Sequence, residues 1–107
     1  TDNAGYFLAR RLKIVAVTGN TTLSASSHAG YYVMVAGSGL VITLPDNQTG
    51  GTHFTIIANG ANSFTLRTGS GAGNGDNMNG SQADITVAAY TAVTAISNAT
   101  DYIVLGV

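Results

Sequence analysis

The sequence predicts an all-β protein: a single antiparallel β-sandwich or barrel-like domain of about nine short strands. Helix-favouring residues are scarce, since the 107-residue chain has no Glu, one Lys and two Gln. Gly and β-branched residues, which disfavour helices, interrupt most windows. Apolar and polar residues also alternate with the period of two that is typical of half-buried strands. Turn residues recur about every ten positions, as they do in sandwiches and barrels.

The alternation places the strands in order along the chain. In the first half we expect strands over 12–18, 21–24, 31–35 and 40–44. In the second half we expect them over 53–58, 63–68, 84–88, 92–97 and 102–107. Since the segment 31–35 is apolar at successive positions, it predicts a central strand that is buried on both sides.

Turn residues separate these strands. Residues 26–30 predict a turn, and Pro45 ends the strand before it because Pro cannot donate a hydrogen bond to the ladder. Asn59-Gly60 is a dipeptide typical of hairpin turns. A long Gly/Asn loop is expected over 69–80 and a turn over 98–101. A solenoid is an alternative, but no fixed repeat period supports it.

The segment 1–11 differs from the rest of the chain and predicts an N-terminal arm in front of a β-domain that spans 12–107. It holds two aromatic residues and two of the four Lys and Arg residues of the chain. A loosely held tail is the alternative interpretation, because chain termini are often poorly anchored.

Composition limits the classes of function. Charged residues make up 8% of the chain and the net charge is −1, whereas ordinary domains are roughly one quarter charged. A nucleic-acid partner is not expected, because such binding needs a basic face. A membrane partner is not expected either, since no window approaches the roughly 18 apolar residues of a spanning helix. The absence of Cys excludes a disulfide scaffold.

No catalytic pattern stands out, so we expect no enzymatic activity, no cofactor and no small-molecule substrate. Ser27 and His28 are only sequence neighbours, whereas a nucleophilic Ser needs a base and an orienting group. The Gly-rich run 71–76 lacks the Lys or following helix of a phosphate cradle. We expect no metal site; the alternative is a site at His28 and His53 where copies converge on a symmetry axis.

Several short motifs follow one another in a fixed order through the chain. They lie at 22–30, 42–45, 51–59, 64–80 and 95–104. In order and spacing they resemble a recurrent β-domain of tailed-bacteriophage structural proteins, over about residues 18–107. Tyr102 stands where that family often has Trp, which keeps an aromatic side chain at the position.

The resemblance implies a virion structural protein that forms a homotrimer and has no enzymatic activity. Such domains occur in trimeric capsid cement, decoration or head-fibre proteins, and in head domains of tail fibres or spikes. We expect a capsid cement protein, because eleven residues supply neither a stalk nor a baseplate attachment. Thr1 fits the removal of an initiator Met, so we expect a complete small gene product. The alternative is the receptor-binding knob of a tail fibre or spike, which binds a host surface or carbohydrate.

The expected partners are further copies of the chain and the major capsid protein. The expected location is the outer capsid surface, after assembly in the host cytoplasm. Aromatic residues and Arg are the usual anchors of interfaces, and an extended arm can add a strand to a sheet edge. The capsid-contact candidates are therefore Tyr6, Phe7, Arg10 and Arg11. The trimer-interface candidates are Tyr32, Arg67 and Tyr102. On an outward strand face we expect Arg67 to form a salt bridge or to extend along the surface; the alternative in an oligomer is a pair with Asp84 or Asp101 across the interface.

Overall fold

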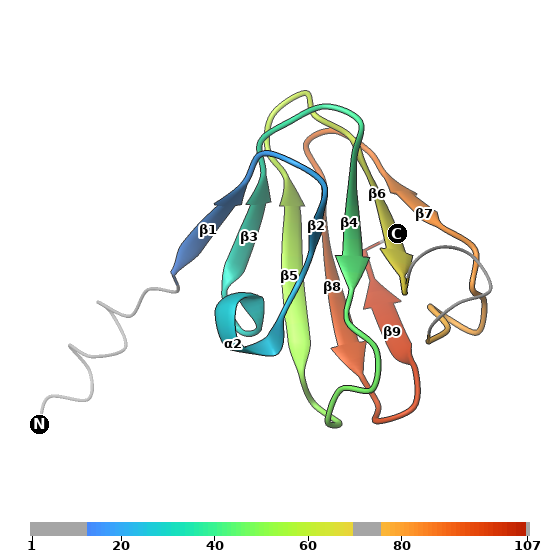
Figure 1. Ribbon diagram of the computed structural model, residues 1–107. Helices are drawn as coiled ribbons and strands as arrows, with labels where there is room; N and C mark the ends of the chain where they lie inside the picture. The colour runs from blue at the N-terminus through green and yellow to red at the C-terminus, as the bar shows by residue number, and fades with distance from the viewer. Residues whose placement is uncertain (1–12, 70–75, 107) are drawn as a thin grey trace, which may run out of the picture.

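The computed structural model describes residues 13–69 and 76–106, and these residues form an all-β fold (Figure 1). The predicted all-β class and the number of strands, about nine, are confirmed for this part of the chain. The strands are β1 (Ile14–Val17), β2 (Thr21–Thr22), β3 (Tyr32–Val35), β4 (Leu40–Leu44), β5 (His53–Ala58), β6 (Phe64–Thr68), β7 (Ile85–Val87), β8 (Ala92–Ser97) and β9 (Tyr102–Leu105). The predicted arm, residues 1–11, lies outside the described residues.

The strands form two mixed sheets. Sheet A has the order β1-β3-β5-β8-β9, and sheet B has the order β2-β4-β6-β7. The first six strands alternate between the two sheets, and within each sheet they pair in parallel. The antiparallel pairs all involve the last three strands: β7 pairs with β6, β8 pairs with β5, and β9 pairs with β8. The prediction of an antiparallel domain is therefore wrong for the first two thirds of the strands.

This topology means that the chain winds three times between the two sheets before the antiparallel strands complete them (Figure 1). Each of the first four strands pairs with the strand one full turn later in the chain. β1 thus pairs with β3, where Ile14 lies opposite Tyr32, and β3 pairs with β5, where Tyr32 lies opposite Thr55. The turns differ in length because their loops differ. A solenoid-like winding is therefore present in these residues without the fixed period by which a repeat is recognised.

Two predicted turns differ in part from the structure. Residues 25–28 form α2 (Ala25–His28), a single helical turn capped by Ser24, whose Oγ accepts a hydrogen bond from the Ser27 amide at 3.3 Å. The His28 ring nitrogen Nδ1 accepts from the Ser24 amide at 3.0 Å. Asn59-Gly60 joins strands of different sheets, so it does not close a hairpin. No helix in the described residues has both the length and the apolar character that a membrane crossing requires.

The inward side chains of both sheets form one hydrophobic cluster, in which Tyr102, Phe54 and Phe64 are the largest fully buried members. The alternation in β5 and β6 predicts their inward residues correctly. Those residues are Phe54, Ile56, Ala58, Phe64 and Leu66. β3 is buried on its inner side alone, because Val33 and Val35 are buried whereas Tyr32 is exposed. The prediction of a strand buried on both sides is wrong for this chain.

The outer edge of β9 is covered by a side chain. The Asn79 amide group donates to the Val104 carbonyl at 3.0 Å and accepts from the Val104 amide at 2.8 Å. The Asn79 backbone amide donates to the Tyr102 carbonyl at 3.0 Å. Asn79 thus takes the hydrogen bonds that a further strand would make there, and it does so from a left-handed backbone conformation with φ of 52°.

Candidate interaction surfaces

The outer face of sheet A is the most apolar exposed surface of the described residues. Because side chains alternate along a strand, paired residues of neighbouring strands share a face. One such row crosses all five strands, from Ile14 through Tyr32, Thr55 and Thr94 to Leu105. We call the outward residues of this sheet the apolar face. They are Ile14, Ala16, Tyr32, Met34, His53, Thr55, Ile57, Ala92, Thr94, Ile96, Ile103 and Leu105.

Large hydrophobic side chains are strongly exposed on the apolar face. Four of the five such residues in the described chain lie here: Ile14 (57% exposed), Leu105 (53%), Ile103 (45%) and Tyr32 (39%). The face has no Asp, Glu, Lys or Arg. The Oγ1 atoms of Thr55 and Thr94 lie 3.3 Å apart and satisfy each other. Large apolar side chains gathered on one exposed face favour a role in protein interaction.

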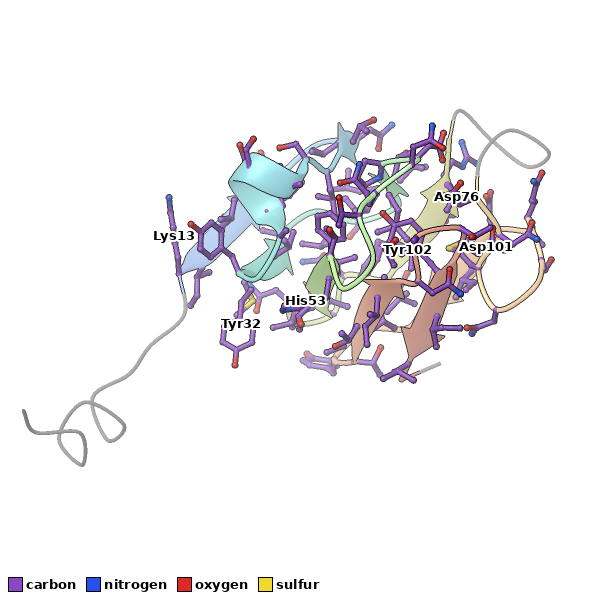
Figure 2. The ribbon with its side chains drawn as sticks, turned by 90° about the horizontal axis from the view of Figure 1, so that it is seen from below. Lys13, Tyr32, His53, Asp76, Asp101 and Tyr102 are labelled. Atoms are coloured by element: carbon purple, nitrogen blue, oxygen red, sulfur yellow. The ribbon has the colours of Figure 1, made fainter. Side chains whose placement is uncertain are left out.

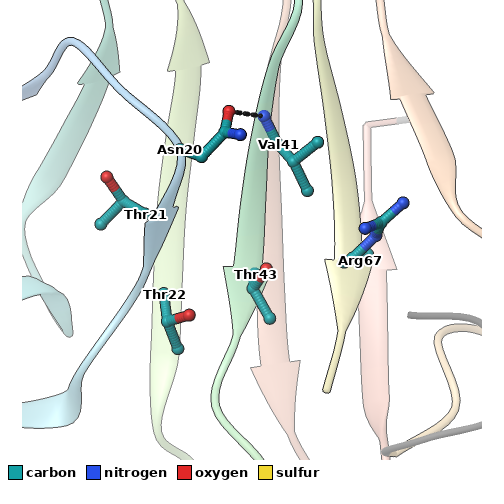
Figure 3. Close-up of a pocket in the computed structure, with 6 residues that line it drawn as sticks. All are labelled: Asn20, Thr21, Thr22, Val41, Thr43 and Arg67. Atoms are coloured by element: carbon teal, nitrogen blue, oxygen red, sulfur yellow. Dashed lines mark hydrogen bonds between the residues drawn. The ribbon is translucent and has the colours of Figure 1, made fainter. Parts of the chain in front are cut away.

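The outer face of sheet B is polar and is hollowed by a shallow groove of about 240 Å³ (Figure 3). Its lining residues are Asn20, Thr21, Thr22, Val41, Thr43 and Arg67. The Asn20 side-chain oxygen accepts a hydrogen bond from the Val41 amide at 2.9 Å. The groove therefore offers hydroxyl groups, an amide and one guanidinium, and it fits polar ligands better than apolar ones.

Arg67 is paired within its own chain. Its Nη2 lies 2.7 Å from Asp84 Oδ2, and its Nε donates to Oδ1 at 3.2 Å. The hydrogen bond to Asp84 raises the pKa of Arg67. The expected salt bridge of Arg67 on an outward strand face is thus confirmed, and its carboxylate comes from Asp84 of the same chain and not from another copy.

Three Asp side chains gather at one end of the molecule, around the loops that enclose Tyr102 (Figure 2). Asp46 accepts from the Asp76 amide at 3.1 Å, and Asp76 accepts from the Asn47 amide at 3.2 Å. Asp101 accepts from the Asn77 amide at 2.9 Å. These carboxylates tie loops together, as expected of Asp in turns. Within 13–69 and 76–106, no three His, Asp, Glu or Cys are grouped so that they could hold a metal ion.

Tyr102 lies in the core beneath these loops. Its hydroxyl donates to the Pro45 carbonyl at 2.7 Å, and the residue is 0% exposed. Burial raises its pKa, and the negative charges of Asp76 and Asp46 raise it further. The prediction that Tyr102 contacts another copy is wrong, because its side chain is enclosed by its own chain. The register of β9 turns it inward, between Phe54 and the Pro45 loop.

The three predicted trimer-interface residues do not come together. Tyr32 points outward from the apolar face and Tyr102 is inside (Figure 2), whereas Arg67 lines the groove on the outer side of the other sheet (Figure 3). The capsid-contact candidates lie outside the described residues, and they are Tyr6, Phe7, Arg10 and Arg11. Ile57 and Ile103 were not among the interface residues predicted from the sequence. The feature that could have indicated them is a strand with apolar residues at both its inward and its outward positions.

No protein-family model matches this chain, and no curated protein sequence is similar to it.

Proposed function

We propose that the protein is a structural protein of a tailed-bacteriophage virion, a capsid cement or decoration protein. It binds as a homotrimer across capsid subunits on the outer capsid surface, where it stabilises the shell. In this proposal the two sheets form a β-sandwich, and residues 1–11 form the arm that contacts the major capsid protein. The resemblance of the sequence to phage β-domains suggests this class of function, and the use of charge in the described residues supports it.

The supporting observation is that every Asp, Lys and Arg side chain in the described residues is engaged within the chain. Arg67 pairs with Asp84, and three Asp side chains bind backbone amides of neighbouring loops. The Lys13 ammonium lies 5.6 Å from the centre of the Tyr31 ring. Small free-standing domains usually carry many charges of both signs that face water. A surface with so few free charges fits a protein that is covered by other protein.

In this proposal the cement function comes from several contacts that one trimer makes at the same time. A trimer that touches several capsid subunits at once multiplies weak contacts into strong overall binding. Because it binds the assembled shell and not its separate parts, it stabilises that shell by mass action. The arm candidates Tyr6, Phe7, Arg10 and Arg11 would supply these contacts.

A second candidate function is the receptor-binding knob of a tail fibre or spike. The groove on sheet B favours it, because its Thr hydroxyls, the Asn20 amide and the Arg67 guanidinium are groups that hydrogen-bond to sugars. This candidate places the ligand on the face opposite the apolar one.

The test mixes the purified protein with undecorated capsids of its phage and pellets the capsids. Full-length protein is expected to pellet with the shell and to raise its disruption temperature, whereas protein without residues 1–11 stays in solution. Thr22→Ala, in the groove, is the matched control and binds capsids normally. Failure of the full-length protein to bind would contradict the proposal. Binding to host glycans that Thr22→Ala abolishes would favour the receptor-binding knob.

A further inference from the structure

We propose that the apolar face is the surface through which three copies of this chain meet around a three-fold axis. This inference rests on the homotrimer of the proposed function and names the surface that forms it. It assigns the contact to residues outside the earlier candidates, with the exception of Tyr32. Arg67 and Tyr102 take no part in it.

Charge makes the apolar face compatible with copies of itself. It has no Asp, Glu, Lys or Arg, so two copies meet there without like charges opposing each other. A partner of different sequence is usually selected by complementary charges, and this face offers none. The Thr55–Thr94 pair is satisfied within the face, so burying it leaves no hydroxyl without a partner.

The distribution of apolar residues distinguishes a ring from a face-to-face pair. The strongly exposed ones lie on the flanking strands, with Ile14 and Tyr32 on one side and Ile103 and Leu105 on the other. The middle of the row holds Thr55 and Thr94 of β5 and β8. A face-to-face pair would press the threonines into its centre, while the corners of twisted sheets splay apart. A ring brings one flank of each copy onto the opposite flank of the next.

Sheet A gives each copy a face of five strands, and its two outer strands lie about 19 Å apart at the usual strand spacing. The contact is heterologous and closes, so Ile14 of one copy meets Leu105 of its neighbour at each corner.

The test uses disulfide trapping, which suits a chain that has no Cys of its own. The double variant Ile14→Cys with Leu105→Cys is purified and oxidised, and its products are separated on a non-reducing denaturing gel. Within one copy the two positions are four strand spacings apart, about 19 Å, which is far beyond the about 7 Å between Cα atoms that a disulfide spans. Every disulfide therefore joins two copies. Covalent trimer is the expected main product.

The matched control is Thr22→Cys with Thr86→Cys, at the two edge strands of sheet B. It is expected to remain monomeric on the same gel. Each single variant, Ile14→Cys or Leu105→Cys, is also expected to run as a monomer on this gel. The reason is that in the ring each Cys at one flank faces the other flank of the next copy, which then has no Cys. Covalent dimer from Ile14→Cys alone would indicate a two-fold pair and overturn the ring.

Native mass spectrometry of the unmodified protein keeps the inference testable where a Cys variant misfolds. It is expected to show a trimer, and a monomer would overturn the inference. These measurements use no capsids. Trapped trimers that fail to bind capsids would contradict the cement function alone, whereas capsid binding without trapped trimers would contradict the interface alone.

Discussion

Sheet A and sheet B arise from the same winding of the chain, yet their outer faces differ sharply. On sheet B the outward positions carry Thr side chains, and an Arg67–Asp84 ion pair crosses β6 towards β7. On sheet A the equivalent positions carry Ile, Leu, Met, Ala and Tyr between a few polar residues. Both inner faces contribute to one core. The fold therefore needs only the inner faces to be apolar.

The difference indicates that the outer face of sheet A, unlike that of sheet B, has a composition that folding alone does not require. Sheet B has the composition expected of a β-surface in water, where Thr is favoured by the strand and tolerated by solvent. Sheet A keeps Ile14 and Leu105 more than half exposed, although a Thr would satisfy the strand equally well. Such exposure costs solubility unless another surface covers it.

The largest expected effect is loss of the trimer when a charge enters the apolar face. Ile103 is 45% exposed on the apolar face; the proposed trimer would bury an ammonium placed there by Ile103→Lys, and burying an unpaired charge is strongly unfavourable. The variant is expected to sediment as a monomer with an unchanged far-UV spectrum. Thr86→Lys, on the outer side of sheet B, is the control and remains a trimer. A trimer in both variants would remove the distinction between the two faces.

A smaller effect separates the inner and outer sides of a single strand. Ile56 is fully buried whereas its neighbour Ile57 belongs to the apolar face. In the monomeric Ile103→Lys background, Ile56→Ala is expected to lower the free energy of unfolding by about 2–5 kcal/mol, because it leaves a cavity. Ile57→Ala is expected to cost much less there, and instead to weaken the trimer when Ile103 is present. Urea denaturation of the monomers and sedimentation of the trimers measure the two effects. Equal losses in the monomer would mean that Ile57 is not a surface residue.

The smallest effect concerns Tyr102, which both sheets enclose. Its pKa is raised above that of an unfolded Tyr, near 10. The stabilisation from its protonated hydroxyl is therefore complete below about pH 10 and is lost as the pH rises further. Between pH 9 and pH 11 the melting temperature is expected to fall less in Tyr102→Phe than in the parent protein. At pH 7 the variant loses about 1 kcal/mol, since Pro45 loses its donor. An identical alkaline decrease in both proteins would exclude Tyr102 as the cause.

The sequence predicts the strands well because alternation is a local property. The bounds of β4, β5 and β8 are the predicted ones, 40–44, 53–58 and 92–97. The pairing of the strands cannot be predicted in the same way, because hairpins and strands that wind between two sheets show the same alternation. The dipeptide Asn59-Gly60 does not indicate that the next strand joins the other sheet. The antiparallel prediction failed for this reason.

The candidate surface is only partly readable from the sequence. Tyr32 and Tyr102 are both aromatic residues at the start of a strand, yet one is exposed and the other is enclosed. Their opposite environments follow from the phase of each strand relative to the core, which depends on distant residues such as Phe54. A strand with consecutive apolar residues, such as Ile56 and Ile57, does indicate that both of its faces need to be covered by protein.

The side chain of Asn79 has a consequence for the kind of assembly that this protein can build. An open β9 edge would be able to pair with the β1 edge of another copy, and that contact would repeat without closing and give a continuous fibre. Because Asn79 already occupies both backbone groups of Val104, growth along this edge is blocked. Replacement of the Asn79 side chain would free the amide and carbonyl of Val104 for such pairing, whereas those of Tyr102 would keep their backbone partners at Asn77 and Asn79.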